Sequence, residues 1–275
     1  MEGRIIKNIS NDYVVKVNDN LYTCKPRGKF RKDNLVPLVG DIVDIDTENN
    51  YILEIKKRKN SLVRPSVSNV DKAIIVTSVK PKLDTNLLDK LLVVASYNNI
   101  EPVICFTKLD LLNEEEINEI NKIISYYEKV GYMVVVNTDI DKIKSILDNS
   151  LSVFVGQSGS GKSTLLNVLD SNLELKTNEI SKALGRGKHT TRHVELYSVY
   201  GGLVVDTPGF SALDLSMLTN FEIRDNTKEM FDNLDKCKYR DCLHFKEDGC
   251  FVKKQVEDDN ILSSRYVNYI SFLKK

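Results

Sequence analysis

Several features are scarce in this 275-residue sequence. Five cysteines are too few for a disulfide scaffold, and no apolar run approaches the ~20 residues of a membrane helix. The 39 basic residues balance the 39 acidic ones, so any basic patch that attracts nucleic acid must be local. The first residues lead into an alternating segment rather than into the apolar core of a signal peptide. We therefore expect a soluble, cytoplasmic protein without a membrane segment.

What is present is ordinary globular composition, with 41% hydrophobic and 28% charged residues. The length is sufficient for two or three domains. Charge divides the chain into three parts, because residues 1–64 are net positive, residues 65–230 net negative and residues 231–275 close to neutral. We predict one domain in each of these parts.

The first 64 residues predict a small β-barrel. Five short segments rich in β-branched residues are separated by Asn/Asp turns. They are Arg4–Ile9, Tyr13–Val17, Leu21–Cys24, Asp41–Ile45 and Tyr51–Ile55. Five strands in this length favour an OB-fold. The basic runs Lys25–Lys32 and Lys56–Lys59 would give such a barrel a surface for nucleic acid, although solvated loops explain them nearly as well.

Residues 70–225 alternate short apolar strands with helical patterns, which predicts a doubly wound α/β domain with a parallel sheet and helices on both faces. The expected strands are Lys72–Val79, Pro102–Phe106, Met133–Val136, Ser152–Val155 and Leu203–Val205. The expected helices are Asn86–Asn98, Asn113–Val130, Lys142–Asn149 and Lys162–Leu169.

A phosphate-binding loop follows one of these strands and opens a helix. The run Gly156 to Ser163 fits G-x-x-x-x-G-K-[ST], in which backbone N–H groups and a helix N-terminus surround phosphates. Lys162 would reach the β- and γ-phosphates, and the Ser163 hydroxyl would bind Mg²⁺. The nucleotide-binding residues predicted here are Gly156, Gln157, Ser158, Gly159, Ser160, Gly161, Lys162, Ser163 and Thr164.

Two later segments fit the same triphosphate site. Asp206-Thr207-Pro208-Gly209 follows a strand, so Asp206 is placed to manage Mg²⁺ and the Gly209 N–H to sense the γ-phosphate. The glycine-rich basic run Gly185–His193 predicts a switch loop from which Thr191 or Thr190 completes the Mg²⁺ shell. A solvated basic loop is the alternative for the second segment.

The tetrapeptide Thr107-Lys108-Leu109-Asp110 is close to the guanine-reading N-K-x-D pattern. The Asp110 carboxylate would accept from N1–H and the 2-amino group of guanine, a donor pair that adenine lacks. The Lys108 stem would cover the base, and Thr107 stands where Asn is usual. The pattern precedes the phosphate loop, whereas a standard GTPase has it afterwards, which indicates a circularly permuted domain with GTP/GDP as ligand.

A cluster of metal-binding residue types lies near the C-terminus. Cys237, Cys242, His244 and Cys250 offer three thiolates and one imidazole, the set typical of a closed structural Zn²⁺ site. After it, residues 259–275 predict a helix with an apolar stripe of Leu262, Tyr266, Ile270 and Leu273, which we expect to pack against the zinc cluster.

Together these motifs resemble the circularly permuted, ribosome small-subunit-dependent GTPases of bacteria, over nearly the whole chain. Asn69-Val70-Asp71, which opens the second part, also fits the resemblance. It implies a multidomain α/β protein with an OB-fold barrel (1–64), a circularly permuted P-loop GTPase domain (65–230) and a zinc-binding domain with a helix (231–275).

The resemblance also implies an activity. It implies slow GTP hydrolysis stimulated by the 30S subunit, contacts of the barrel and zinc domain with 16S rRNA, and a role in late 30S maturation by a monomer. The residue after D-T-P-G is the apolar Phe210 where many GTPases keep a water-orienting Gln, and the resemblance assigns that task to His189. Catalysis is therefore assigned to His189 and Lys162. The fifth nucleotide motif is not visible, and Asn137-Thr138-Asp139 occupies its place.

Two other functions remain open from the residues alone. Ser158–Leu166 also resembles the phosphate loop of ABC-type ATPases, but the chain has no L-S-G-G-Q signature. A nucleic-acid-binding protein with a vestigial nucleotide site is the second alternative, against which the intact Lys162, Ser163 and Asp206 argue.

Overall fold

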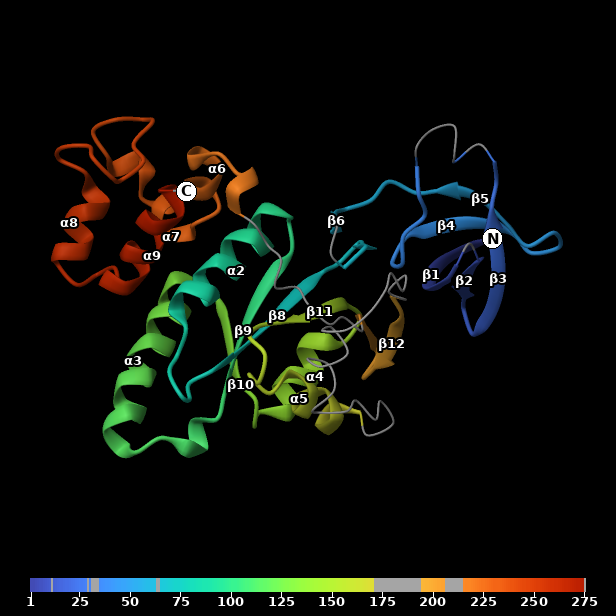
Figure 1. Cartoon of the computed structure of the whole chain (residues 1–275), viewed down its shortest axis with the longest axis horizontal. Coiled ribbons are helices and arrows are strands. Elements are labelled where there is room, and N and C mark those ends of the chain that lie inside the picture. The colour runs from blue at the N-terminus through green and yellow to red at the C-terminus, as the bar shows by residue number, and fades with distance from the viewer. Residues whose placement is uncertain are drawn as a thin grey trace, which may run out of the picture. The chain divides into compact units, whose positions relative to one another are not determined.

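The computed structural model describes residues 1–10, 12–28, 30, 35–62, 65–170, 194–205 and 215–274. The chain forms two compact units, each assembled from separate stretches (Figure 1). The first draws on residues 1–73, 140–154 and 163–210, and the second on residues 74–139, 155–162 and 211–275. Among the described helices none is both long and apolar enough to span a membrane.

The N-terminal strands close into a barrel, as predicted. The barrel order is β1-β2-β3-β5-β4, with β1 and β4 closing it, and β3 and β5 pair in parallel while the other pairs are antiparallel. The burial of β2 alternates residue by residue, because one face of a strand lines the barrel and the other meets solvent. The strands are β1 (Glu2–Ile9), β2 (Asp12–Val17), β3 (Asn20–Pro26), β4 (Ile42–Asp46) and β5 (Tyr51–Ile55).

The Asn69-Val70-Asp71 segment holds the chain just after the barrel and the short pair β6 (Ser61–Leu62) and β7 (Val67–Ser68). The Asn69 side chain accepts from the Lys59 N–H at 2.8 Å and donates to the Gly40 carbonyl at 3.1 Å. The Asp71 carboxylate accepts from the Leu151 N–H at 2.8 Å and pairs with the Lys59 ammonium at 3.1 Å. The side chains of Asn69 and Asp71 therefore hold the backbone of this segment in place through hydrogen bonds and an ion pair, which a pattern of apolar residues would not reveal.

The α/β part is built on a six-stranded sheet with the order β10-β9-β8-β11-β13-β12. Every residue of β11 is buried, and alternate side chains of a strand point to opposite faces, so both faces are covered as predicted. The edge strand β12 was not predicted and pairs antiparallel to β13, which makes the sheet mixed. The strands are β8 (Lys72–Ser78), β9 (Glu101–Thr107), β10 (Met133–Val136), β11 (Leu151–Val155), β12 (Leu196–Val199) and β13 (Gly202–Val205).

Helices follow most of these strands, and their ends have clear local causes. The Asp84 side chain caps α2 by accepting from the Leu87 N–H, and Asn113 and Glu116 form a capping box on α3. Gly131 ends α3 in the left-handed conformation that glycine adopts most readily. The elements are α2 (Thr85–Tyr97), the 3₁₀ turn η1 (Leu109–Leu111), α3 (Glu114–Val130), α4 (Ile140–Leu147) and α5 (Lys162–Leu169).

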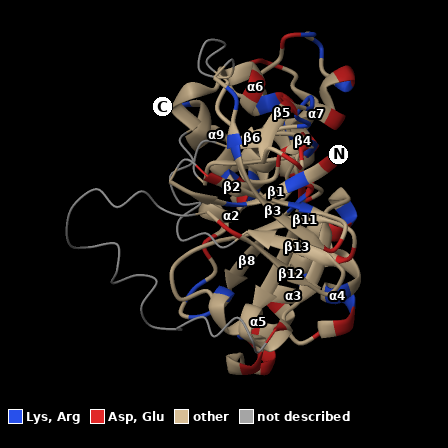
Figure 2. Cartoon of the chain, turned by 90° about the vertical axis from the view of Figure 1, so that its right-hand side faces the viewer, with Lys and Arg blue, Asp and Glu red and all other residues tan. Residues whose placement is uncertain are grey.

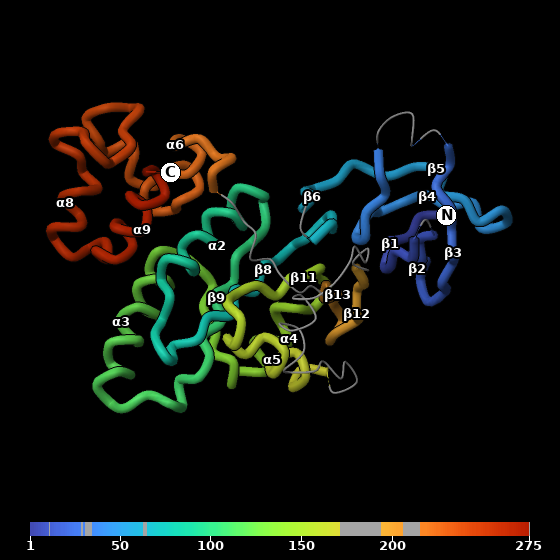
Figure 3. Tube along the Cα trace, in the orientation of Figure 1, coloured from blue at the N-terminus to red at the C-terminus, as the bar shows by residue number. Residues whose placement is uncertain are grey.

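The C-terminal part is a group of short helices around its own apolar cluster, and its last helix packs along α2 (Figure 3). The elements are η3 (Leu215–Met217), α6 (Asn220–Asp225), α7 (Lys228–Asp232), η4 (Leu234–Lys236), α8 (Phe251–Glu257) and α9 (Ser263–Leu273). Tyr266, Ile270 and Leu273 of the predicted stripe pack in the apolar cluster that includes Cys242 and Cys250, as expected. The most buried face of α9 is different and comprises Arg265, Asn268, Tyr269, Phe272 and Leu273. A hydrophobic pattern could not reveal it, because two of these residues are polar.

Arg265 is the centre of a buried polar network. Its guanidinium, 2% exposed, binds both carboxylate oxygens of Glu229 at 2.8 and 3.0 Å and Asp89 at 2.6 Å. The hydroxyls of Tyr126 and Tyr127 donate to Glu229 and Asp89, each at 2.7 Å. The network therefore joins α2, α3, α7 and α9 through satisfied charges.

Candidate nucleotide-binding and metal sites

The predicted phosphate loop lies between β11 and α5. Gly156 has φ of +138°, and a Cβ there would lie 2.1 Å from the Val76 carbonyl oxygen, so the loop can pass β8 only with glycine at this position. Gln157, Ser158 and Gly159 are exposed. The loop thus has the strand–loop–helix context that the sequence predicts, with its central residues open to a ligand.

Lys162 curls back over this loop. Its ammonium donates to the carbonyls of Gly156 at 2.8 Å and Gln157 at 2.7 Å, and no acidic side chain described in the structure pairs with it. Burial lowers the pKa of Lys162. A half-buried cation with only neutral partners is suited to an anionic ligand such as a phosphate.

Ser160 is the one loop residue that is deeply buried, at 1% exposure. Its hydroxyl oxygen is among the few buried side-chain polar atoms of the described residues that lack a hydrogen-bond partner. An orphaned hydroxyl of this kind is expected at a functional loop rather than in a packed core. The loop residues therefore fit a polar, oxygen-rich ligand. Ser163, which is half-buried, and Thr164, which is exposed, follow in the first turn of α5.

The base-reading segment begins at the end of β9. Thr107 is buried, and its hydroxyl donates to the Ser160 carbonyl at 2.7 Å. Lys108 has φ of +63° and precedes η1, on which Asp110 is exposed. The structure therefore brings the phosphate loop and the Thr107–Asp110 segment together, although they are fifty residues apart in sequence. The unassigned Asn137 follows β10, where its N–H donates to the Phe106 carbonyl.

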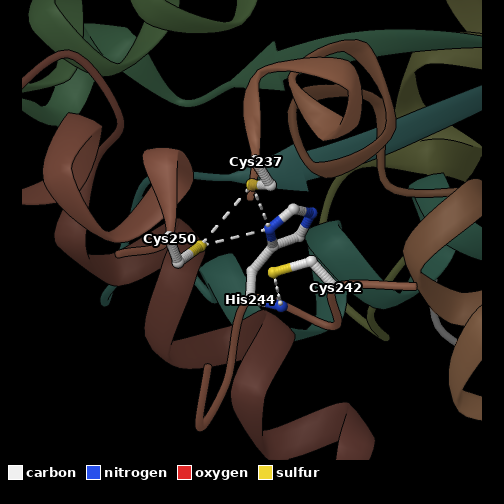
Figure 4. Close-up of side chains that lie close together, drawn as sticks. All are labelled: Cys237, Cys242, His244 and Cys250. Atoms are coloured by element: carbon white, nitrogen blue, oxygen red, sulfur yellow. Dashed lines mark hydrogen bonds between the residues drawn. The ribbon is translucent and has the colours of Figure 1, made fainter. Parts of the chain in front are cut away.

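The four predicted metal ligands also come together (Figure 4). Cys237 Sγ lies 3.4 Å from His244 Nδ1 and 3.8 Å from Cys250 Sγ, and His244 Nδ1 lies 3.3 Å from Cys250 Sγ. All four ligand atoms lie within 4.8 Å of one another. Tetrahedral Zn²⁺ with ordinary bond lengths places its ligand atoms roughly 3.5–3.8 Å apart, so the group fits zinc.

The surroundings of the cluster favour the ligating tautomer of His244 and leave its thiols dependent on a metal for ionisation. His244 Nε2 lies 3.0 Å from the Met230 carbonyl, which places the proton on Nε2 and leaves Nδ1 for a metal. The His244 N–H donates to Cys242 Sγ at 3.4 Å. Burial raises the pKa of the Cys242 thiol to about 12, and a divalent cation supplies the positive charge that a buried thiolate requires. None of the five cysteines, all of which are described, forms a disulfide.

Glu247 and Tyr269, which support this cluster, were not predicted, whereas Tyr266 belongs to the stripe that was expected to pack against it. The Glu247 carboxylate accepts from the N–H groups of Leu243 and Phe245, both at 2.8 Å. The hydroxyls of Tyr266 and Tyr269 donate to the carbonyls of His244 and Leu243, both at 2.7 Å. Nothing in the local sequence identifies these contacts, because the tyrosines come from a helix more than twenty residues away.

Five other predicted site residues, His189, Thr190, Thr191, Asp206 and Gly209, lie outside the described residues, as does Phe210. Their placement in the site therefore stays a prediction.

Comparison with known families agrees with these motifs. The RsgA GTPase model matches residues 55–216, and the RsgA N-terminal domain model matches residues 2–52. The chain belongs to the RsgA GTPase family. The match confirms the predicted GTPase class and argues against the ABC-type ATPase.

Relatives and solved structures cover almost the whole chain. It is 47% identical over 283 residues to "Small ribosomal subunit biogenesis GTPase RsgA 2" of Oceanobacillus iheyensis, covering 100% of this chain and 97% of that protein. It is also 47% identical to an RsgA of Enterococcus faecalis, over 99% of this chain and 94% of that protein.

Two crystal structures share the fold. YloQ, described as a circularly permuted GTPase, is 37% identical with a TM-score of 0.84, covering 99% of this chain and 93% of that one. YjeQ of Thermotoga maritima is 33% identical with a TM-score of 0.84, covering 99% and 97%. The permuted order predicted from the motifs is thus confirmed.

Proposed function

We propose that this RsgA family member hydrolyses GTP to GDP and phosphate in a reaction stimulated by the small ribosomal subunit, and that it acts in late 30S maturation. The observation that carries the nucleotide part is the Lys162 ammonium, which is half-buried on a glycine loop and whose partners among the described residues are two neutral carbonyls. A cation in this setting gains most from an anionic ligand.

In this proposal the phosphates lie against the N–H groups of Gln157 to Ser163, with Lys162 on the β- and γ-phosphates. The exposed Asp110 accepts from the two donors of guanine, and the Lys108 stem covers the base. This division of tasks assigns affinity to the loop and selectivity to Asp110.

The metal and water assignments rest partly on residues outside the described part of the chain. Ser163, Asp206 and Thr191 or Thr190 would hold Mg²⁺, which would neutralise phosphate charge when bound. Gly209 would respond to the γ-phosphate, and His189 would orient the attacking water. Zn²⁺ at Cys237, Cys242, His244 and Cys250 would have a structural role.

The ribosomal part is supported by the printed names of the relatives, which are small ribosomal subunit biogenesis GTPases. We propose the 30S subunit and its 16S rRNA as partners, with contacts from the barrel and the zinc region. We further propose that the protein is a monomer and acts in the cytoplasm. The three domains 1–64, 65–230 and 231–275 likewise stay a proposal. Basic and acidic residues are mixed along the described chain (Figure 2), so rRNA contacts must use local patches.

The test is hydrolysis of GTP and of ATP by the purified, zinc-loaded chain, each with and without isolated 30S subunits. We expect GTP to be hydrolysed in preference to ATP, with a rise on adding 30S subunits. Equal rates for the two nucleotides would contradict the proposal, as would a GTPase rate that 30S subunits leave unchanged.

Two variants separate this function from the alternatives. Asp110→Asn should weaken GDP binding and favour xanthosine diphosphate, whose second carbonyl accepts from the new amide. An inactive Lys162→Ala protein that still supported normal 30S maturation in cells would favour an RNA-binding protein with a vestigial nucleotide site.

A further inference from the structure

Thr107 occupies the first position of the guanine-reading segment, yet its side chain turns away from the surface. It is 1% exposed at the end of β9, and its hydroxyl donates to the Ser160 carbonyl of the phosphate loop at 2.7 Å. The Thr77 carbonyl is the next acceptor, at 3.4 Å. A threonine hydroxyl has one proton to donate, so the shorter contact to the phosphate loop receives it.

The backbone of Thr107 is fixed on its other side. Its carbonyl accepts from the Val79 N–H at 3.2 Å, just after the end of β8. The next residue, Lys108, is held in the left-handed conformation and starts η1, on which Asp110 lies. Thr107 therefore joins three segments at one point: the end of β8, the base-reading segment and the phosphate loop.

The acceptor on the phosphate loop has few other restraints. The Ser160 hydroxyl has no hydrogen-bond partner among the described residues, and the Ser160 N–H reaches only the Gln157 carbonyl of the same loop, at 3.2 Å. Gly161, which follows, has φ of +95°, and its backbone lies next to Thr107, since a Cβ there would be 3.8 Å from the Thr107 side chain. Without the Thr107 donor, the buried Ser160 carbonyl would lose its partner, and the loop would lose its side-chain anchor on β9.

We propose that Thr107 is a positioning residue that holds the phosphate loop through the Ser160 carbonyl, and that it does not read the base. This inference rests on the proposed GTPase function. Thr107 sets the affinity for the diphosphate or triphosphate through the loop, while guanine selectivity stays with Asp110. Thr in place of Asn at this position thus leaves base recognition intact.

The test compares GDP with 7-deaza-GDP, an analogue that lacks the N7 acceptor available to a base-reading hydroxyl. Affinities are measured by calorimetry on the full, zinc-loaded chain for the wild type and for Thr107→Val, which keeps the shape and removes the donor. We expect Thr107→Val to weaken both ligands about tenfold, because a buried carbonyl loses its partner. The ratio of the two dissociation constants should stay at its wild-type value.

A matched pair of variants guards against misfolding. Thr107→Ser keeps the hydroxyl and Thr107→Cys replaces it with a poor donor of similar size, so their difference isolates the hydrogen bond from the lost methyl group. We expect Thr107→Ser to bind GDP like the wild type and Thr107→Cys to match Thr107→Val, with the thermal unfolding midpoints of Ser and Cys variants agreeing within a few degrees.

Two results would overturn the inference. One is unchanged GDP affinity in both Thr107→Val and Thr107→Cys, since the hydroxyl would then be irrelevant. The other is a loss that is present for GDP and absent for 7-deaza-GDP, since the hydroxyl would then contact the base. Failure of the proposed function looks different, because the wild type itself would then bind neither GDP nor GTP.

Discussion

Arg265 and Lys162 are two cations in the same unit of the molecule, and both are withdrawn from bulk water. Their surroundings shift their pKa values in opposite directions. Arg265 meets two carboxylates, and the neighbouring charges of Glu229 and Asp89 outweigh burial and raise its pKa. Within the described part of the chain Lys162 contacts two carbonyls and no carboxylate, and burial lowers its pKa. Arg265 is therefore a structural charge, which neighbouring carboxylates neutralise. Lys162 has no such neutralising partner among the described residues, as expected of a charge that binds a ligand.

The zinc cluster extends this comparison to groups that become negatively charged. Cys237, Cys242 and Cys250 bring three thiols together with one imidazole, a donor set that binds a divalent metal as thiolates. Here the fold supplies the donors and leaves the positive charge to a metal. Both ligand sites are therefore marked by incomplete compensation, while the Arg265 network is complete.

Loss of the metal should have the largest effect on stability. Because binding free energy of a structural zinc is also folding free energy, on the order of 10 kcal/mol in small zinc domains, Cys250→Ser should lose bound zinc and loosen the residues around α8 and α9. Zinc content by mass spectrometry and hydrogen exchange measure this. Cys24→Ala, at a buried cysteine of the barrel, is the control and should keep its zinc. Full zinc occupancy in Cys250→Ser would refute the site.

Disruption of the Arg265 network should have the second-largest effect on stability. Arg265→Met leaves Glu229 and Asp89 buried without a counter-charge, which we expect to cost about 3–5 kcal/mol of unfolding free energy. Urea unfolding measures it, and Arg240→Met, at an exposed arginine, is the matched control. Adding Glu229→Gln to Arg265→Met should recover part of the loss. If Arg265→Met lost no more unfolding free energy than the control, Arg265 would not be neutralising Glu229 and Asp89 as described.

A smaller effect is expected from one hydroxyl of that network. Tyr126 donates to Glu229 Oε1, which also accepts from Arg265, so Tyr126→Phe leaves no carboxylate oxygen without a partner. We expect a loss of about 1 kcal/mol in the same urea measurement. Tyr97→Phe, at a residue that is 42% exposed, should change nothing measurable. A loss as large as that of Arg265→Met would show that the hydroxyl carries more of the network than its geometry implies.

The sequence predicted the elements whose signals lie within a few residues, and it did not predict contacts between residues far apart in the chain. The helix Lys162–Leu169 agrees residue for residue with α5, and α3 differs from its prediction only because Asn113 is the cap rather than the first turn. These elements carry their signals within a few residues. The five barrel strands were found for the same reason.

The missed features depend on partners far along the chain. Arg265 contacts Asp89 across 176 positions, and no local pattern marks this arginine as a buried residue of its helix. The antiparallel strand β12 is only four residues long, and its burial does not alternate, because its two end residues are buried and its two central residues are not. The Thr107 pattern predicts a nucleotide-site segment, but it does not reveal the contact of Thr107 with Ser160, because that contact depends on how two strands end side by side.

The central claim is that the Lys162 ammonium binds the phosphates of the nucleotide and that Asp110 selects guanine over adenine. Calorimetric titration of the zinc-loaded chain with GDP and with ADP, repeated on Lys162→Ala, tests it directly. We predict binding of GDP but not of ADP, and a loss on the order of 100-fold in Lys162→Ala with unfolding free energy unchanged. Equal binding of GDP and ADP, or GDP binding that Lys162→Ala leaves intact, would contradict the account.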